Sequence, residues 1–235
     1  MQISDLKRKL RCLRCDRRGV TIIEFAFGFP FVLFLGLYGL ELSNLAIMNL
    51  RVSQVALNLA DNASRVGVDT GLPTLDLREV DINDVLTGAQ KQGAPFKLTE
   101  RGRITVSTLY HDGTNQRIHW QRCLGMKKGP GWDSSYGTAT ITDGSDATPA
   151  NRGRLRPEGM GPAGQVVHAP PGSGVIFVEI NYDYEPLIDT TWIGTNATKL
   201  HYTASFIVRD RRNYSQIFNP APAAKRYTCN LYTTK

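Results

Sequence analysis

Residues 20–50 read VTIIEFAFGFPFVLFLGLYGLELSNLAIMNL and form the longest apolar run of the chain. Glu24 and Glu41 are its only residues among Asp, Glu, Lys and Arg. As a helix rising about 1.5 Å per residue it would be roughly 46 Å long, whereas the hydrocarbon core of a bilayer is about 30 Å thick. The stretch therefore predicts a helix that crosses a membrane and continues beyond it.

Residues 1–19, which precede this stretch, form a basic leader. The leader carries seven Lys and Arg side chains against the acids Asp5 and Asp16, so it holds +5 of the chain's net charge of +7. Positive charge beside a membrane helix marks the cytoplasmic side, so we expect the rest of the chain on the far side. The basic balance is therefore explained by topology, and it does not indicate a nucleic-acid partner.

A small residue, Gly19, comes before the apolar stretch, whereas the cut site of a secretory signal follows a shorter apolar region. The residues that follow it are Val20 to Ile23, Glu24, Phe25, Ala26 and, further on, Pro30. This pattern resembles the start of the TadE/TadG-like pseudopilins of the tight-adherence (Flp pilus) system, over residues 17–67. In that family a prepilin peptidase cuts after the glycine and leaves four residues before a glutamate. The resemblance implies a processing site between Gly19 and Val20.

Glu24 would then be the fifth residue of the mature chain. An acid at the centre of a membrane helix costs about 3 kcal/mol on insertion scales, so it needs a reason to be there. Cleavage would create an amine at Val20, four residues before Glu24 and on the same helix face. We predict that Glu24, with Phe25 beside it where many relatives carry Tyr, pairs with this amine on its own chain or on a neighbour in a filament. The alternative is that Glu24 lies at headgroup level, where the helix dipole favours an anion.

Beyond residue 50 the hydrophobic pattern predicts an α+β fold. Apolar residues at steps of three and four continue the long helix as an amphipathic helix up to Gly67, and a short helix follows near 80–91. Strands are predicted where apolar and polar residues alternate, at 104–110, 118–124, 176–184 and 200–208. We expect an antiparallel sheet of about four strands packed on the long helix, with one face buried and one wet.

The predicted organisation divides the chain into four segments. They are a cytoplasmic leader at 1–19, a transmembrane helix at 20–50, an amphipathic helix with a connecting segment at 51–100, and a periplasmic β-rich domain at 101–235. A Gly- and Pro-rich insertion at 125–174 interrupts the last segment, and we expect it to form a loop because it is too polar for a core.

The four cysteines fall on the two sides of the predicted membrane. Cys12 and Cys15 lie in the leader, where we expect reduced thiols. Cys123 and Cys229 lie in the exported part, where an oxidising periplasm would allow a disulfide between them. Two separate thiols are the alternative.

Arg209, Arg211 and Arg212 form a basic cluster after the last predicted strand. These guanidinium groups could contact a neighbouring subunit or anionic lipid headgroups. The alternative is a solvated strand end with no partner.

Catalytic and metal motifs give no positive signal. Gly159, Gly161 and Gly164 match the letters of GxGxxG, but no strand is predicted before them and no helix after them, as a dinucleotide site requires. The four histidines show no metal-ligand spacing. We therefore predict no cofactor, no metal and no enzymatic activity.

The resemblance implies a single-pass pseudopilin of the bacterial inner membrane that acts in assembly of a Flp-type pilus. Its partners would be a prepilin peptidase, other pseudopilins, the major Flp pilin, the inner-membrane secretion platform and membrane lipid. The main alternative is an uncleaved, signal-anchored envelope protein that binds a ligand or another envelope protein. An anchored periplasmic enzyme is a further alternative, and the motifs give it no support.

Overall fold

The computed structural model describes residues 19–187 and 198–234. The chain divides between Leu45 and Ala46 into two compact units, which are described separately. Helix α2, Val20–Arg65, runs through this division and belongs to both units. Most of the leader, including Cys12 and Cys15, lies outside the described residues. The β-rich part and the segment 51–100 belong to the same unit, residues 46–235.

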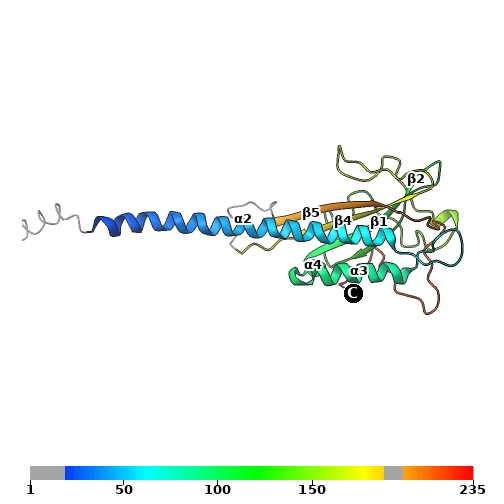
Figure 1. Cartoon of the computed structure of the whole chain (residues 1–235), viewed down its shortest axis with the longest axis horizontal. Helices are drawn as coiled ribbons and strands as arrows, with labels where there is room; N and C mark the ends of the chain where they lie inside the picture. Colours follow the sequence, from blue (N-terminus) through cyan, green and yellow to red (C-terminus); the bar gives the residue numbers. More distant parts are fainter. Residues whose placement is uncertain (1–18, 188–197, 235) are drawn as a thin grey trace, which may run out of the picture. The chain divides into compact units, whose positions relative to one another are not determined.

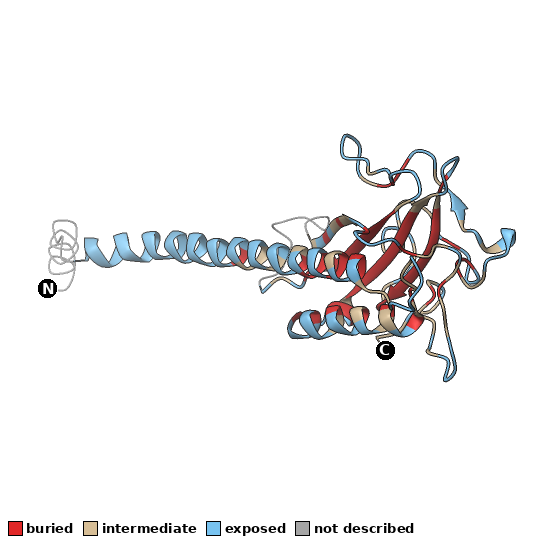
Figure 2. Cartoon of the chain, turned by 45° about the vertical axis from the view of Figure 1, so that its right-hand side comes forward, coloured by how far each residue is buried: buried red, intermediate tan, exposed pale blue. Residues whose placement is uncertain are grey.

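In the first unit, α2 is an uninterrupted helix even though Pro30 lies inside it. Its large apolar side chains are exposed on every side of the helix, as Figure 2 shows for its first half. By length and composition α2 is able to cross a membrane, and it is the single such helix in the described part of the chain. This combination agrees with a single-pass membrane anchor, because a helix that is apolar all round must be covered by something other than water.

The second unit is built on one antiparallel sheet. Its strand order is β3-β2-β1-β4-β5, and every neighbouring pair is antiparallel. The strands are β1, Gly102–His111; β2, Gln116–Leu124; β3, Arg154–Leu155; β4, Gly174–Asp183; and β5, Lys199–Ile207. The predicted α+β class is confirmed, and the sheet has five strands where about four were expected. The additional strand, β3, has two residues and pairs with the start of β2, so alternation could not reveal it.

Helices cover one face of this sheet (Figure 1). They are the part of α2 from Ala46 onward, α3 at Glu79–Gly93, and α4 at Leu98–Arg101, with a 3-10 turn at Ala94–Phe96 before α4. The predicted apolar stripe of α2 is buried, since Val52, Val55, Leu59 and Ala63 are each at most 7% exposed. Residues of α2 and α3 meet Val106 and Trp120 of the sheet around one small apolar gap, which places a hydrophobic core between the helices and the sheet.

The opposite face of the sheet is covered as well, so the expected wet face is wrong. The insertion between β2 and β4 folds over this face and buries Ala139, Met160 and Ala169. These residues form a second apolar cluster with sheet residues, namely Leu109, Ile118, Val175 and Phe177. Figure 2 shows the resulting burial along the central strands. The insertion is therefore a covering layer as well as a loop.

Polar residues on this covered face are satisfied by the insertion. Gln121 accepts a hydrogen bond from the backbone nitrogen of Ala139 (2.7 Å) and donates one to the carbonyl of Gly137 (2.9 Å). Glu179, which is fully buried, accepts hydrogen bonds from the hydroxyl of Ser134 and the backbone nitrogen of Ser135. Burial raises the pKa of the Glu179 carboxyl, and these two donors oppose that effect. Alternation in these strands therefore separates two buried faces of different chemistry.

The carboxy-terminal tail is fixed to the same face. A disulfide joins Cys123 of β2 to Cys229, the pairing considered from the sequence. Next to it, the fully buried Arg103 donates to the carbonyls of Gly125 (3.0 Å), Leu231 (2.7 Å) and Cys229 (2.6 Å). Its guanidinium also lies over the ring of Tyr232, 4.4 Å from the centroid. The tail is thus held by one covalent bond and by one buried cation.

A buried ion pair connects α3 to the sheet. Arg122 of β2 donates through Nε to Glu79 at the start of α3 (2.9 Å) and makes a second, shorter contact through Nη2. Both side chains are at most 1% exposed. Removing one partner of such a pair leaves the other charge buried, which typically costs about 3–5 kcal/mol.

We therefore expect Arg122→Met to lower the free energy of unfolding by about 3–5 kcal/mol. Urea unfolding of the full chain in detergent, followed by tryptophan fluorescence, measures this loss. Arg65→Met is the matched control, because its i,i+4 partner Asp61 is partly exposed and such pairs contribute about 0–1 kcal/mol. Equal losses in the two variants would contradict the structural role given to Arg122.

Candidate functional site

The predicted processing junction lies where α2 begins. Gly19 forms a turn directly before the helix, and its carbonyl accepts the first helical hydrogen bond, from the backbone nitrogen of Ile23 (3.2 Å). A Cβ built on Gly19 would meet nothing within 4 Å. The fold therefore does not require glycine at this position, and a cut between Gly19 and Val20 would leave the helix complete.

Glu24 and Phe25 lie in the second turn of α2, and both are exposed. Phe25 stacks on Phe29, with ring centroids 5.0 Å apart. Val20 and Glu24 are separated by four residues in a continuous helix, so the backbone at Val20 and the Glu24 carboxylate share one face. This is the geometry that pairing between a new terminal amine and Glu24 requires.

Arg212 is placed differently from the sequence expectation. It is 7% exposed, and its Nη2 donates to the carbonyls of Ala63 (3.3 Å), Ser64 (3.4 Å) and Val66 (2.6 Å), which end helix α2. Burial lowers the pKa of this guanidinium. The solvated alternative is wrong for Arg212, because its side chain is buried and caps a helix. Its contact with an anionic group or a neighbouring subunit stays a prediction.

The other two arginines of the predicted cluster remain on the surface. Arg211 is exposed, and Arg209 is exposed with its Nη2 atom 3.8 Å from a carboxylate oxygen of Asp61. Their contact with a subunit or with lipid stays a prediction.

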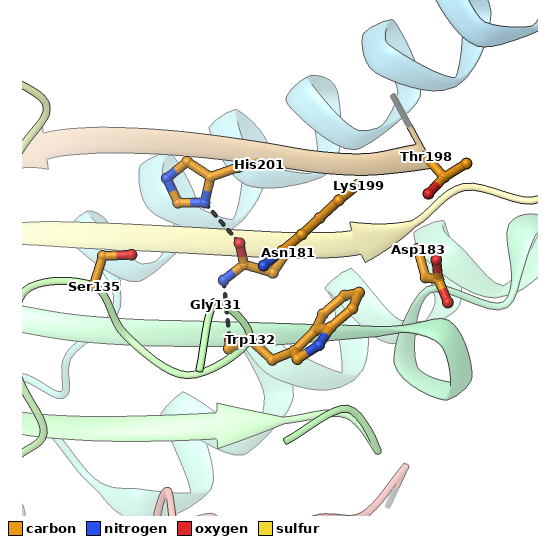
Figure 3. A pocket seen from close by; sticks show the side chains of 8 residues that line it. All are labelled: Gly131, Trp132, Ser135, Asn181, Asp183, Thr198, Lys199 and His201. Atoms are coloured by element: carbon orange, nitrogen blue, oxygen red, sulfur yellow. Dashed lines mark hydrogen bonds between the residues drawn. The ribbon is translucent and has the colours of Figure 1, made fainter. Parts of the chain in front are cut away.

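A pocket of about 480 Å³ lies beside the ends of β4 and β5 (Figure 3). Asn181 projects into it and connects two neighbours, since its oxygen lies 2.7 Å from Nδ1 of His201 and its nitrogen donates to the carbonyl of Trp132 (2.9 Å). Lys199 lies over the Trp132 ring, with Nζ 4.8 Å from the centroid. These polar groups satisfy one another, so the arrangement is explained by the fold without a ligand.

A larger polar pocket, of about 810 Å³, opens at the turn between β1 and β2, and we call it the hairpin-end pocket. The hairpin, the insertion and the segment after β5 all line it. Its wall includes Tyr110 and Tyr214, whose rings stack 4.2 Å apart, together with Arg117, His119 and Arg212. Sequence analysis missed this site because its residues come from four distant segments, the fourth being represented by Thr74, and match no motif.

His119 gives the hairpin-end pocket a pH-sensitive group. The side chain is 4% exposed, and its Nδ1 atom lies 3.3 Å from the carbonyl of Arg152. Burial lowers the pKa of His119, and the contact with the Arg152 carbonyl opposes that effect. His119 is therefore protonated less often in the folded protein than in the unfolded chain. The free energy of unfolding decreases as the pH falls below about 6.5, the usual pKa of histidine.

We expect the free energy of unfolding to fall for this reason between about pH 7 and pH 5, by at most about 1.4 kcal/mol per pH unit for this one group. Glu179 has a raised pKa, so its contribution to the free energy of unfolding decreases as the pH rises above the ordinary pKa of a glutamate, which opposes the effect of His119. Comparison of the wild type with His119→Asn isolates the contribution of His119, because the Asn amide does not titrate and is able to keep the contact with the Arg152 carbonyl. Urea unfolding across this pH range should show a smaller slope for the variant, and equal slopes would contradict the assignment.

Among the described residues, no group of three or more His, Cys, Asp and Glu side chains is placed to hold a metal ion. Comparisons of the chain with protein-family models, with curated proteins and with solved structures find no match. The features that bear on function are therefore the junction at Gly19, the apolar helix and the domain that follows.

Proposed function

We propose that this chain is a pseudopilin that is cut by a prepilin peptidase and acts in assembly of a Flp/Tad-type pilus. One observation carries the proposal. An exposed apolar helix begins at Val20, directly after a glycine that the fold does not need, and it carries an acid four residues later. A membrane span alone would account for the apolar helix, but it would not account for Gly19 and Glu24.

In this proposal each part of the chain has a separate role. The peptidase removes residues 1–19 and exposes the amine of Val20. The first half of α2 stays in the inner membrane, and neighbouring pilin helices pack on it during assembly, where Glu24 pairs with an amine of its own chain or of a neighbour. The unit of residues 46–235 lies in the periplasm and supplies no enzymatic activity. Its partners are other pseudopilins, the major pilin and the secretion platform.

The hairpin-end pocket favours a second candidate function. An uncleaved envelope protein, anchored by the same helix, would also display this domain in the periplasm and would bind a ligand there. The two candidates differ at Gly19, because only the pseudopilin needs to be cut.

Filament yield tests the proposal in the bacterium that carries the gene. We expect deletion of the gene to reduce sheared surface filaments at least tenfold, and the wild-type gene to restore them. A Glu24→Ala copy should be cut normally but fail to restore filaments, whereas Glu100→Ala, which removes an exposed acid from α4, should restore them. Unchanged filament yield in the deletion strain would contradict the proposal.

A further inference from the structure

Unpartnered polar atoms gather at the hairpin-end pocket. Among the described residues, buried side-chain atoms without a hydrogen-bond partner include Nε of Arg117, Nε2 of His119, and both Nε and Nη1 of Arg212. All three residues line this one pocket. A buried polar group without a partner costs free energy, so such groups are rare in folded proteins and their clustering requires an explanation.

The charge of the pocket is positive. Arg117, Arg152 and Arg212 bring three guanidinium groups to its wall, and Asp112 brings one carboxylate. One oxygen of Asp112 already accepts hydrogen bonds from the backbone nitrogens at residues 114 (2.9 Å) and 115 (2.6 Å) of the turn. Among the described residues, the guanidinium of Arg117 makes one hydrogen bond, from Nη1 to the Gly153 carbonyl at 3.5 Å, which is long for a hydrogen bond. Guanidinium groups with spare donors are suited to bind carboxylate and phosphate oxygens.

The pocket is also larger than a bare anion needs. Its volume of about 810 Å³ is within the range of small-molecule sites. The stacked rings of Tyr110 and Tyr214 form part of the wall, and Asn115 adds an amide that is able to donate to and accept from hydroxyl groups. These features fit a polyhydroxylated ligand that carries one acidic group.

Comparison with the other pockets supports this assignment. In the pocket beside β4 and β5, Asn181 is hydrogen-bonded both to His201 and to the carbonyl of Trp132. None of the residues lining that pocket, or lining the pocket beside Cys123 and Cys229, supplies an unpartnered buried side-chain atom among the described residues. Among the described residues, the hairpin-end pocket is the one of these three pockets that is lined by buried side-chain donors without acceptors, and these donors belong to Arg117 and Arg212.

We propose that the hairpin-end pocket binds a sugar-sized acidic ligand, whose carboxylate or phosphate group is held by Arg117, Arg152 and Arg212. Arg212 has a further role in capping α2, so it is fixed in place before the ligand arrives. Arg117 and Arg152 have no such role and supply the adjustable part of the site. The site is independent of processing at Gly19, and its test does not depend on the pilus.

Isothermal titration of the full chain in detergent tests the proposal, with galacturonate, glucose 6-phosphate, inorganic phosphate and neutral glucose as probes. We expect at least one of the two acidic sugars to bind and glucose to bind at least tenfold more weakly. Galacturonate and glucose 6-phosphate distinguish a carboxylate from a phosphate group. Binding of inorganic phosphate alone would overturn the sugar-sized ligand, and no binding of any acidic probe at 10 mM, roughly the weak end of useful affinities, would overturn the site.

Variants separate this site from general surface charge. Arg117→Gln and Arg152→Gln should each weaken binding of the acidic sugar about tenfold. Arg152 is exposed, so its replacement leaves folding intact even if the Arg117 variant is unstable. Arg154→Gln is the matched control, because Arg154 is an exposed arginine of β3 that does not line the pocket. Equal binding by the wild type and both pocket variants would overturn the proposal.

Discussion

Gly19→Phe should accumulate as the uncut chain in cells that contain a prepilin peptidase, while the wild-type chain loses residues 1–19. We expect the cut fraction to fall from nearly all of the protein to less than about a tenth. A Cβ at Gly19 meets no other atom within 4 Å, and the residue is exposed, so the substitution leaves the fold intact. Loss of cleavage would therefore report recognition of Gly19 by the peptidase.

Gly28→Phe is the matched control for this experiment. Gly28 lies inside α2, and a Cβ built there also meets nothing within 4 Å. The same side chain is added nine residues after the junction, so this variant should be cut like the wild type. The intact masses of the membrane-extracted proteins distinguish the cut from the uncut form. Normal cleavage of Gly19→Phe would show that the junction is not recognised through this glycine.

Removing the disulfide should produce the largest loss of stability. Cys123 and Cys229 are separated by 106 positions in the sequence, and closing a loop of this size contributes about 4–5 kcal/mol in the chain-entropy model. The bond also holds the tail that supplies the Leu231 and Cys229 carbonyls to the buried Arg103. A loosened tail would remove two of the three carbonyls that accept hydrogen bonds from that guanidinium, which adds to the loss.

The double variant Cys123→Ala/Cys229→Ala should therefore unfold at a urea concentration lower by about 2 M, given slopes of about 1–3 kcal/mol per molar urea. Tryptophan fluorescence of the full chain in detergent follows the transition. The leader cysteines provide the control, because Cys12→Ala/Cys15→Ala removes two cysteines and keeps both Cys123 and Cys229. Equal midpoints for the disulfide variant and the wild type, both purified without reductant, would contradict the stabilising role of this bond.

Periodicity was sufficient to predict the elements that bury an apolar face. The stripe of α2 around Val52 and Leu59, helix α3, and strands β1, β2, β4 and β5 all follow from steps of three and four or from alternation. Strand β3 could not be predicted, because two residues carry no period. Arg212 illustrates a second limit, since a charged run usually indicates solvent and nothing in the local sequence shows that the α2 carbonyls lie beside it.

The covered second face shows why polar residues in strands were misjudged. Glu179 and Gln121 alternate with apolar residues, a pattern typical of a solvated face. In the structure their partners are backbone groups and a hydroxyl of the insertion at Ser134, Ser135, Gly137 and Ala139. The insertion bonds these side chains mainly through backbone groups, which every residue type supplies. Its polar composition therefore gave no indication that it covers the sheet. The hairpin-end pocket escaped prediction for a related reason, because it forms only when four segments meet.

The central claim is that the chain is a pseudopilin cut between Gly19 and Val20. The most direct test is the intact mass and amino-terminal sequence of the wild-type protein, extracted from membranes of cells with and without a co-expressed prepilin peptidase. The account predicts a chain that begins at Val20 only when the peptidase is present. A chain that begins at Met1 under both conditions would contradict the claim and would leave an uncut, membrane-anchored domain.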